Sequence, residues 1–192
     1  MIEMSLPVPD GYNRLTQAMV GLFAAQLDDL LRRLKRATEG MTVEQLEWQP
    51  HPGMNTIGML LTHLALTEIW WLNVAAAGIP AKPEGEKILN GILGVEGIDD
   101  GLPLPPDGVH PAKLKGMALA DYLGILDKAR AAVHQALQEW VDGDLETMYA
   151  LEDAKFSRSW MLYHVLEHFA THYGQMLMLK HMMRDAGVLP KS

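Results

Sequence analysis

The sequence predicts an all-α protein, a single antiparallel four-helix bundle that forms one domain over residues 1–192. Three observations predict this fold. Hydrophobic residues recur at helical spacing in four long segments, glycine and proline interrupt the chain between these segments, and no segment shows the period of two that is typical of strands. The chain is 48% hydrophobic and 21% charged, which is the balance of an ordinary globular domain. Four helices of about 20 to 30 residues favour a bundle.

The first helix is predicted over about residues 11–39. Leucine and methionine recur at helical spacing, three to five residues apart, in this segment, and Gly40 ends it. Asp10 has a side chain suited to an N-cap. The basic cluster near its end, Arg32, Arg33, Lys35 and Arg36, is interpreted as a solvated face whose cations offset the helix dipole.

The second helix is predicted over about residues 56–77, after a segment rich in proline and glycine. Either Asn55 or Thr56 can cap it through a side-chain oxygen. Gly78 and Pro80 end it. This is the most apolar part of the chain and is about long enough to cross a bilayer, but it contains His63, Glu68 and Asn73, so a buried bundle helix is favoured over a membrane span.

A long loop rich in proline and glycine is predicted between the second and third helices, over residues 79–116. Irregular segments longer than about 15 residues are uncommon in compact domains unless they have a role. The loop is therefore a candidate wall of a binding site or an oligomer contact, with a tolerated surface excursion as the alternative.

The third helix is predicted over about residues 118–141, where apolar side chains again share one side and Asp142 and Gly143 mark the end. The fourth is predicted over about residues 157–186, with Ser157 as its N-cap. Apolar or aromatic residues surround much of its circumference.

Charge and cysteine content exclude several classes of function. The net charge of −8 opposes binding to phosphate backbones, so nucleic acid is not an expected partner. The absence of cysteine excludes disulfides, cysteine-rich metal sites and a thiol nucleophile from the protein itself. Residues 1–10 lack the basic start and apolar run of a signal peptide, so we expect a cytoplasmic protein that does not bind membranes.

Three histidines follow one another at four-residue spacing in the fourth helix: His164, His168 and His172. Side chains four residues apart lie on neighbouring turns, close enough for two imidazoles to reach one metal ion. Side chains four residues apart differ in direction by about 40° around the helix axis, so one ion can bind two adjacent histidines of the three but hardly all three. The helix therefore offers one pair and leaves one histidine over.

A third ligand has to come from another helix, and His63 is the one histidine embedded in a strongly apolar helical segment. A buried, neutral imidazole with one hydrogen bond is the structural alternative for this residue. The remaining histidines are predicted to be ordinary surface or capping residues: His51, His110, His134 and His181.

Other metal architectures do not match the sequence. A di-iron bundle needs Glu-x-x-His on two helices, and a zincin needs His-Glu-x-x-His; neither occurs. Three neutral imidazoles would leave a divalent ion its full charge and one open position, as in a catalytic zinc site. Imidazole also suits nickel and iron, so zinc is the default and these two are alternatives.

Side chains near the histidines could complete such a site. Met59, Thr67 and Trp70 lie one or two turns from His63 on the second helix, and Trp160 and Tyr163 precede the histidines of the fourth. They could line an aromatic pocket over the open position, or simply pack in the core. Gln175 could orient a ligand or pack between helices.

These residues resemble a known family. The stretch Pro50-His-Pro-Gly-Met-Asn-Thr-Ile-Gly with His63 downstream, and His164-x-x-x-His168-x-x-x-His172-Tyr-Gly-Gln175, are similar to the motifs of the DinB/YfiT-like superfamily. The resemblance implies that His63, His168 and His172 bind the metal and that His164 is the spare. The loop over residues 79–116 looks longer than the common core.

The resemblance also implies a function. Some relatives are metal-dependent enzymes that use a low-molecular-weight thiol such as bacillithiol, mycothiol or glutathione, and homodimers are common among them. We therefore expect a metal-dependent enzyme that transfers an external thiol to an electrophilic small-molecule substrate. The alternatives are a hydrolase that uses a metal-bound hydroxide, a non-catalytic bundle that binds metal for stability or carries a partner, and a bundle without metal.

Overall fold

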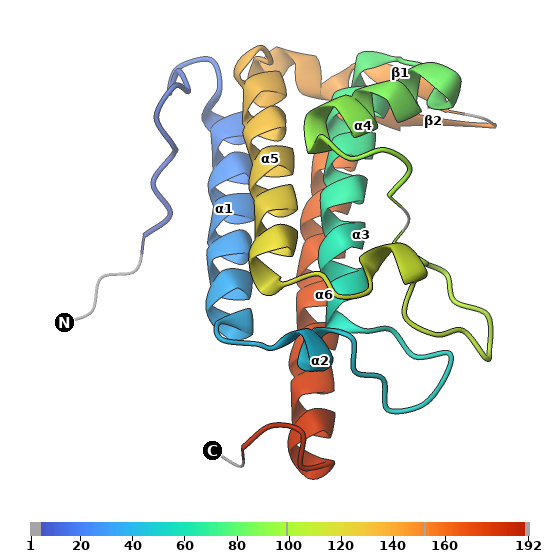
Figure 1. Ribbon diagram of the computed structural model, residues 1–192. Coiled ribbons are helices and arrows are strands. Elements are labelled where there is room, and N and C mark those ends of the chain that lie inside the picture. The colour runs from blue at the N-terminus through green and yellow to red at the C-terminus, as the bar shows by residue number, and fades with distance from the viewer. Residues whose placement is uncertain (1–4, 99, 152, 191–192) are drawn as a thin grey trace.

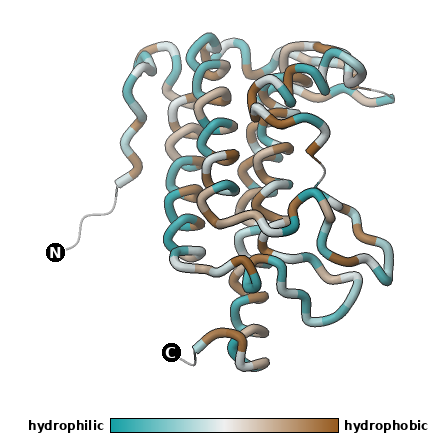
Figure 2. The backbone as a smooth tube through the Cα atoms, viewed as in Figure 1, coloured by the Kyte–Doolittle hydropathy of each residue, from teal (hydrophilic) through white to brown (hydrophobic). Residues whose placement is uncertain are grey.

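The computed structural model describes residues 5–98, 100–151 and 153–190, and the prediction of a mostly helical protein is confirmed. The long helices are α1 (Ala18–Thr38), α3 (Ile57–Ile69), α5 (Leu119–Gln138) and α6 (Arg158–Asp185). Two shorter α-helices, α2 (Val43–Leu46) and α4 (Glu86–Leu93), lie in the connections, and α3 continues as a π-helical turn over Trp70–Val74. Hydrophobic and hydrophilic residues are interspersed along the long helices (Figure 2).

The four long helices pack around a common core, in which α3 contacts α5 and α6, and α1 contacts the same two helices (Figure 1). The side chains at the start of α3 meet those at the start of α5, since Gly58 lies against Tyr122, and ten residues later Glu68 binds Arg130. Helices α3 and α5 therefore run in the same direction. The prediction that successive helices are antiparallel is wrong for this pair, because the long connection between them returns the chain to the end at which α3 began.

That connection is not the continuous loop predicted over residues 79–116. It contains α4, whose Leu89 and Leu93 pack toward the core, with Leu93 fully buried. Gly94 ends α4 in the left-handed conformation, with φ of 71°. Helix α4 has only eight residues, and because glycine and proline are frequent around it, the sequence pattern did not predict it.

The ends of α3 and α6 agree with the capping predictions. The hydroxyl of Thr56, rather than Asn55, accepts a hydrogen bond from the backbone N–H of Met59 at 3.1 Å. The hydroxyl of Ser157 accepts one from the backbone N–H of Trp160 at 3.1 Å. Each hydroxyl satisfies an N–H that has no partner within the helix.

The start of the first helix was predicted wrongly. Helix α1 begins at Ala18, and Asp10 does not cap it. Instead the carboxylate of Asp142, which follows α5, accepts hydrogen bonds from the backbone N–H groups of Met19 and Val20 at 3.0 and 3.1 Å. A cap supplied by a residue more than 120 positions away leaves no local signal in the sequence.

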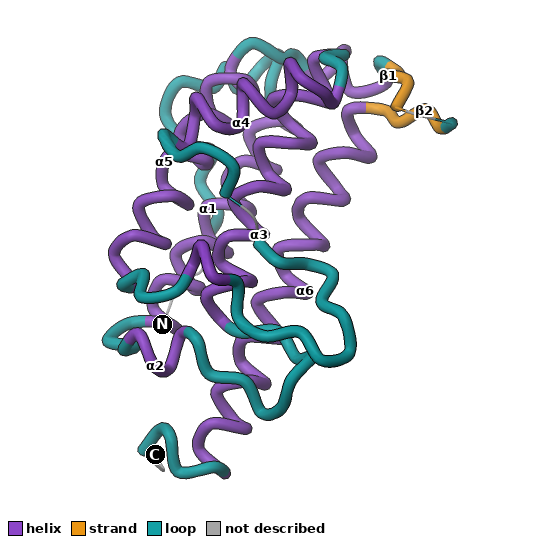
Figure 3. The backbone as a smooth tube through the Cα atoms, turned by 45° about the vertical axis from the view of Figure 1, so that its right-hand side comes forward, coloured by secondary structure: helices purple, strands orange, loops and turns teal. Residues whose placement is uncertain are grey.

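A two-stranded antiparallel hairpin precedes α6, whereas the sequence predicted no strands. It consists of β1 (Met148–Leu151) and β2 (Ala154–Ser157), with Tyr149 opposite Phe156. The hairpin lies at the end of the molecule where α6 begins (Figure 3). Strands of four residues are too short for a period of two to stand out.

Residues 57–77 have the length and composition of a membrane span, but 67% of their most apolar window is buried against the rest of the protein. This burial agrees with the prediction that the segment is a core helix of the bundle.

A network of charged side chains, of which Arg130 and Glu68 are buried and Asp28 is partly exposed, connects three of the long helices. Arg130 of α5 donates from Nε to the Glu68 carboxylate of α3 at 3.2 Å and from Nη1 to the Asp28 carboxylate of α1 at 3.1 Å. His134 contacts the same Asp28 carboxylate through Nε2 at 2.9 Å and the Tyr12 hydroxyl through Nδ1 at 3.0 Å. His134 is therefore a partly buried member of a polar network, and its prediction as an ordinary surface or capping residue is wrong.

Candidate metal centre

The structure brings together His63 of α3 with His168 and His172 of α6. The Nε2 atom of His168 lies 3.1 Å from Nε2 of His63 and 3.1 Å from Nε2 of His172. All three candidate ligand atoms lie within 4.8 Å of one another. Ligand nitrogens around a tetrahedral ion, with bonds of about 2.0 to 2.1 Å, are separated by about 3.3 Å. The cluster can therefore hold a divalent metal ion.

The hydrogen bonds behind two of these rings fix their tautomers. A carboxylate oxygen of Asp100 accepts a hydrogen bond from Nδ1 of His63, and the amide oxygen of Gln175 accepts one from Nδ1 of His172 at 2.8 Å. With the proton on Nδ1, each neutral ring directs the Nε2 lone pair toward His168. A single proton on Nε2 of His168 can satisfy only one of the two contacts, whereas a cation among the three nitrogens would satisfy all of them. The site therefore fits a metal on the chemistry of its donors.

Asp100 is a member of the site that sequence reasoning missed. It lies between α4 and α5, is buried, and its second oxygen accepts a hydrogen bond from the backbone N–H of Leu102 at 2.9 Å. A carboxylate in this position holds a ligating imidazole in place and raises its basicity. Asp100 is 37 residues from His63 in the sequence, so no spacing rule connects them.

The shared environment favours the neutral form of His168 and of His172. Burial, together with the nearby imidazoles of His172, His63 and His164, lowers the pKa of His168 to about 3. Burial also lowers the pKa of His172, against the opposing effect of its hydrogen bond to Gln175. Metal ligation requires neutral imidazole, so both rings are in the form that a metal binds.

This shift predicts that acid destabilises the metal-free protein. In the unfolded chain His168 has an ordinary pKa of about 6.5, so below that pH the unfolded state binds a proton that the folded state does not. The free energy of unfolding should therefore fall as the pH decreases from about 6.5 toward 3, by at most about 1.4 kcal/mol per pH unit for one histidine. Urea unfolding at about pH 7, 6 and 5 in the presence of a chelator measures this slope.

A His168→Gln variant is the control for this slope, because glutamine does not titrate. We expect its unfolding free energy to depend less steeply on pH, by about one proton. An unchanged slope in the variant would show that another group causes the acid sensitivity.

His164 remains outside the cluster. Its ring stacks on Trp160 with centroids 4.8 Å apart and an interplanar angle of 9°, and it lies edge-on to Trp71. Of the remaining histidines, His110 is partly buried and contacts the Thr56 hydroxyl through Nδ1 at 2.8 Å, so it supports the start of α3 rather than being an ordinary surface residue. His51 and His181 are exposed, as predicted.

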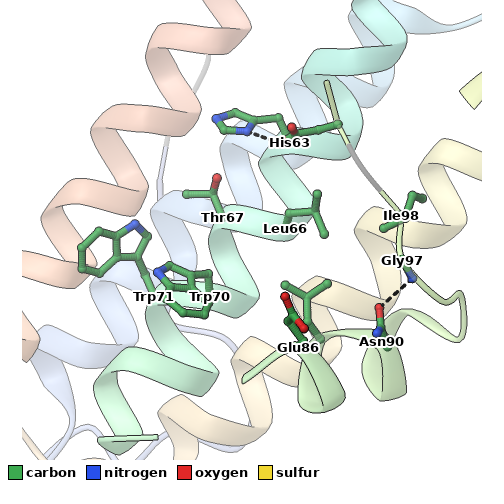
Figure 4. A pocket seen from close by; sticks show the side chains of 11 residues that line it. His63, Leu66, Thr67, Trp70, Trp71, Glu86, Asn90, Gly97 and Ile98 are labelled. Atoms are coloured by element: carbon green, nitrogen blue, oxygen red, sulfur yellow. Dashed lines mark hydrogen bonds and ion pairs between the residues drawn. The ribbon is translucent and has the colours of Figure 1, made fainter. Parts of the chain in front are cut away.

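A pocket of about 420 Å³ opens beside His63 and Asp100 (Figure 4). It is lined by Thr67 of α3 and by Trp70 and Trp71 of the π-helical turn that follows α3; Thr67 and Trp70 are two of the residues predicted to lie near the metal. The other predicted residues lie elsewhere: Met59 is buried in the core, Trp160 packs on His164, and Tyr163 is exposed.

Both the sequence and the fold of this chain are similar to those of known proteins. Residues 26–176 match the sequence model of the DinB superfamily. No curated protein matches the sequence significantly.

Two solved structures share the fold. One is the crystal structure of a DinB-like protein from Bacillus cereus ATCC 10987, with 24% identity and a TM-score of 0.58 over 86% of this chain and 91% of that chain. The other is a conserved protein from Enterococcus faecalis, with 15% identity and a TM-score of 0.62 over 84% of this chain and 94% of that chain.

Proposed function

The chain belongs to the DinB superfamily, and from this premise we propose that it is a metal-dependent enzyme whose His63, His168 and His172 bind one divalent cation. The proposed reaction is the transfer of an external low-molecular-weight thiol to an electrophilic small molecule. Zinc is the first metal to test, followed by nickel and iron.

The observation that carries this proposal is the convergence of the Nε2 atoms of three histidines, with hydrogen bonds to Asp100 and Gln175 fixing the tautomers of two of them, His63 and His172. A structural zinc site is normally closed by four protein ligands. The described residues bring three histidines together here, and a metal held by these three alone would keep an open position, which favours catalysis. The adjoining pocket supports the same interpretation, because it gives a small molecule access to His63.

The role of each residue follows from its contacts. A divalent cation with three neutral ligands retains its full charge and lowers the pKa of a thiol or water that binds to it. His63, His168 and His172 would hold the cation, while Asp100 and Gln175 keep the protons of two rings on Nδ1 and so keep Nε2 available. Leu66, Trp70 and Leu89 contribute apolar walls to the pocket that adjoins His63.

Replacing Asp100 by asparagine is expected to weaken metal binding by about 10- to 100-fold, because the amide is a poorer acceptor for the proton on Nδ1 of His63. Titration with zinc against a competing chelator measures the change. Asp107→Asn, at an exposed position nearby along the chain, is the control and should retain wild-type affinity. Equal zinc affinities in the two variants would show that Asp100 does not contribute to metal binding.

The reaction itself is tested with a chloronitrobenzene and each of the three thiols named above. The metal-loaded protein is expected to form the conjugate with at least one thiol, and both the chelator-treated protein and a His63→Ala variant are expected to lose this activity. Absence of metal-dependent conjugation with all three thiols would contradict the transfer reaction. Hydrolytic activity without any thiol would instead support a metal-bound hydroxide as the nucleophile.

A further inference from the structure

A second pocket, of about 290 Å³, adjoins the histidine cluster. It is formed by the loop before α3, by α3 itself and by the second half of α6. We call it the methionine pocket, and its side chains include Met54, Asn55, Leu60, Gln175, Met178 and Met182. The pocket of about 420 Å³ that is lined by Thr67, Trp70 and Trp71 is called the tryptophan pocket.

The two pockets lie on opposite sides of the histidine cluster. Helix α3, with the turn that continues it, and α6 run in opposite directions, because Trp71 lies against His164 with ring centroids 5.0 Å apart, while the earlier His63 lies against the later His168. Leu60, which precedes His63 on α3, lines the methionine pocket together with α6 residues beyond the cluster. A cation held by the three histidines would therefore have one pocket toward the start of α3 and the other toward its end.

Each pocket also includes a group that positions one of the ligand histidines. The carboxylate of Asp100, which accepts a hydrogen bond from His63, lines the tryptophan pocket. The amide of Gln175, which accepts one from His172 at 2.8 Å, lines the methionine pocket. Two small molecules, one in each pocket, would be brought to the same ion from opposite sides.

The tryptophan pocket suits the less polar of two such molecules. Leucine, isoleucine and tryptophan side chains form its apolar part, and Thr67 lies between His63 and the two tryptophans in Figure 4. Indole rings provide large flat surfaces against which an aromatic molecule stacks.

The methionine pocket has a different chemistry. The described residues that line it carry no charge, and its polar side chains are the amides of Asn55 and Gln175. Among the described residues, none forms a hydrogen bond with the Asn55 amide, and none accepts one from the amide nitrogen of Gln175. Each amide therefore has hydrogen-bonding capacity left for a ligand. The flexible thioether side chains around them can adapt to its shape.

We propose that the methionine pocket binds the body of the thiol through uncharged amide or hydroxyl groups, and that the tryptophan pocket binds the electrophile. The inference rests on the proposed function and specifies where each of its two reactants binds. A thiol with amide groups close to its sulfur matches the amides of Asn55 and Gln175. A carboxylate would enter this pocket without a basic partner among the described lining residues, so an uncharged thiol is the preferred class.

Thiol binding is measured without any electrophile, on the full chain loaded with cobalt in place of zinc. A thiol that binds cobalt does so as the thiolate and adds a charge-transfer band to the absorption spectrum, so a titration gives its affinity. The probes are N-acetylcysteinamide, which is uncharged, and N-acetylcysteine, which has a carboxylate in place of the amide. Each variant is compared with the wild type for the same thiol, so that the different pKa values of the two thiols cancel.

A cation added to the methionine pocket tests the location directly. Met178 is 61% exposed, so the ammonium group of a Met178→Lys variant can stay in water at the pocket. We expect this variant to bind N-acetylcysteine about 2- to 5-fold more tightly and N-acetylcysteinamide with unchanged affinity. Leu177→Lys is the matched control, because Leu177 is also exposed but does not line the pocket, and it should change neither affinity.

Two further variants separate the pockets. Asn55→Leu removes an amide with little change in size and should weaken binding of both thiols by about 2- to 10-fold, the loss expected for one hydrogen bond. Thr67→Phe fills the tryptophan pocket, and should leave both thiol affinities unchanged while raising the KM for chloronitrobenzene in the conjugation assay. The visible absorption of the bound cobalt shows whether each variant retains the metal site.

Equal effects of Met178→Lys and Leu177→Lys on N-acetylcysteine, unchanged thiol affinity in Asn55→Leu, or weaker thiol binding in Thr67→Phe would each overturn the assignment of the pockets. These outcomes differ from failure of the proposed function. A wild type that binds cobalt but shows no thiolate band refutes thiol transfer together with this inference, and a wild type that binds no cobalt refutes the metal site.

Discussion

A His168→Ala variant is expected to bind zinc more than about 100-fold more weakly than the wild type, a larger loss than removal of an outer hydrogen-bond partner causes. Nε2 of His168 lies 3.1 Å from the Nε2 atoms of both other histidines, so its removal leaves two ligands with no common neighbour. Zinc at about 100 times its dissociation constant should stabilise the folded wild type by about 2.7 kcal/mol. The variant should gain almost none of this at the same zinc concentration.

His164→Ala is the matched control, because it removes a histidine one turn earlier on α6 that stacks on Trp160 and lies outside the cluster. It should retain zinc affinity within a few-fold of the wild type. Thermal unfolding in the presence of a chelator shows whether each variant is folded before metal is added. Equal zinc affinities for His164→Ala and His168→Ala, both folded, would contradict the proposed ligand set.

The second large effect is expected at the buried ion pair between Glu68 and Arg130. A Glu68→Gln variant should lose about 3 to 5 kcal/mol of unfolding free energy, because the Arg130 guanidinium keeps its charge and stays buried without its main partner. Asp28 cannot fully replace Glu68, since its carboxylate is more exposed and also bonds to His134. Urea unfolding of the metal-free protein measures this loss.

Two comparisons show whether the loss comes from an unpaired charge. Glu68→Leu combined with Arg130→Met removes both charges from the core, and should recover most of the stability lost in Glu68→Gln. Asp127→Asn breaks an exposed pair with Lys35, and should cost less than about 1 kcal/mol. If Glu68→Gln costs no more than Asp127→Asn, the buried pair does not hold the helices together as described.

The part of the fold that could be predicted is the part set by local pattern. Hydrophobic spacing predicts the bounds of α5 and α6 to within a few residues, and also those of α3 when the helical turns that continue it to Ala77 are included. The caps at Thr56 and Ser157 follow from their hydroxyl groups. The spacing of four residues between His168 and His172 fixes their proximity within one helix. Local geometry left open which pair of α6 histidines meets His63.

The parts that could not be predicted depend on contacts between distant residues. Asp142 caps α1 only because α5 ends beside the start of α1, and Asp100 reaches His63 only because the chain returns past α3 after α4. Helix α4 is short, and its surroundings are rich in glycine, so its own propensity gave a weak signal. Buried pairing of Glu68 with Arg130 likewise requires the parallel arrangement of α3 and α5, which the sequence pattern does not specify.

The most direct test of the metal site is anomalous diffraction from crystals grown with zinc, with data collected on both sides of the zinc absorption edge. We predict one strong anomalous peak about 2.0 to 2.1 Å from the Nε2 atoms of His63, His168 and His172, with a water or buffer molecule in the remaining position. A peak bound by His164 in place of His172, or no peak among these nitrogens in protein that is saturated with zinc, would contradict the proposed centre.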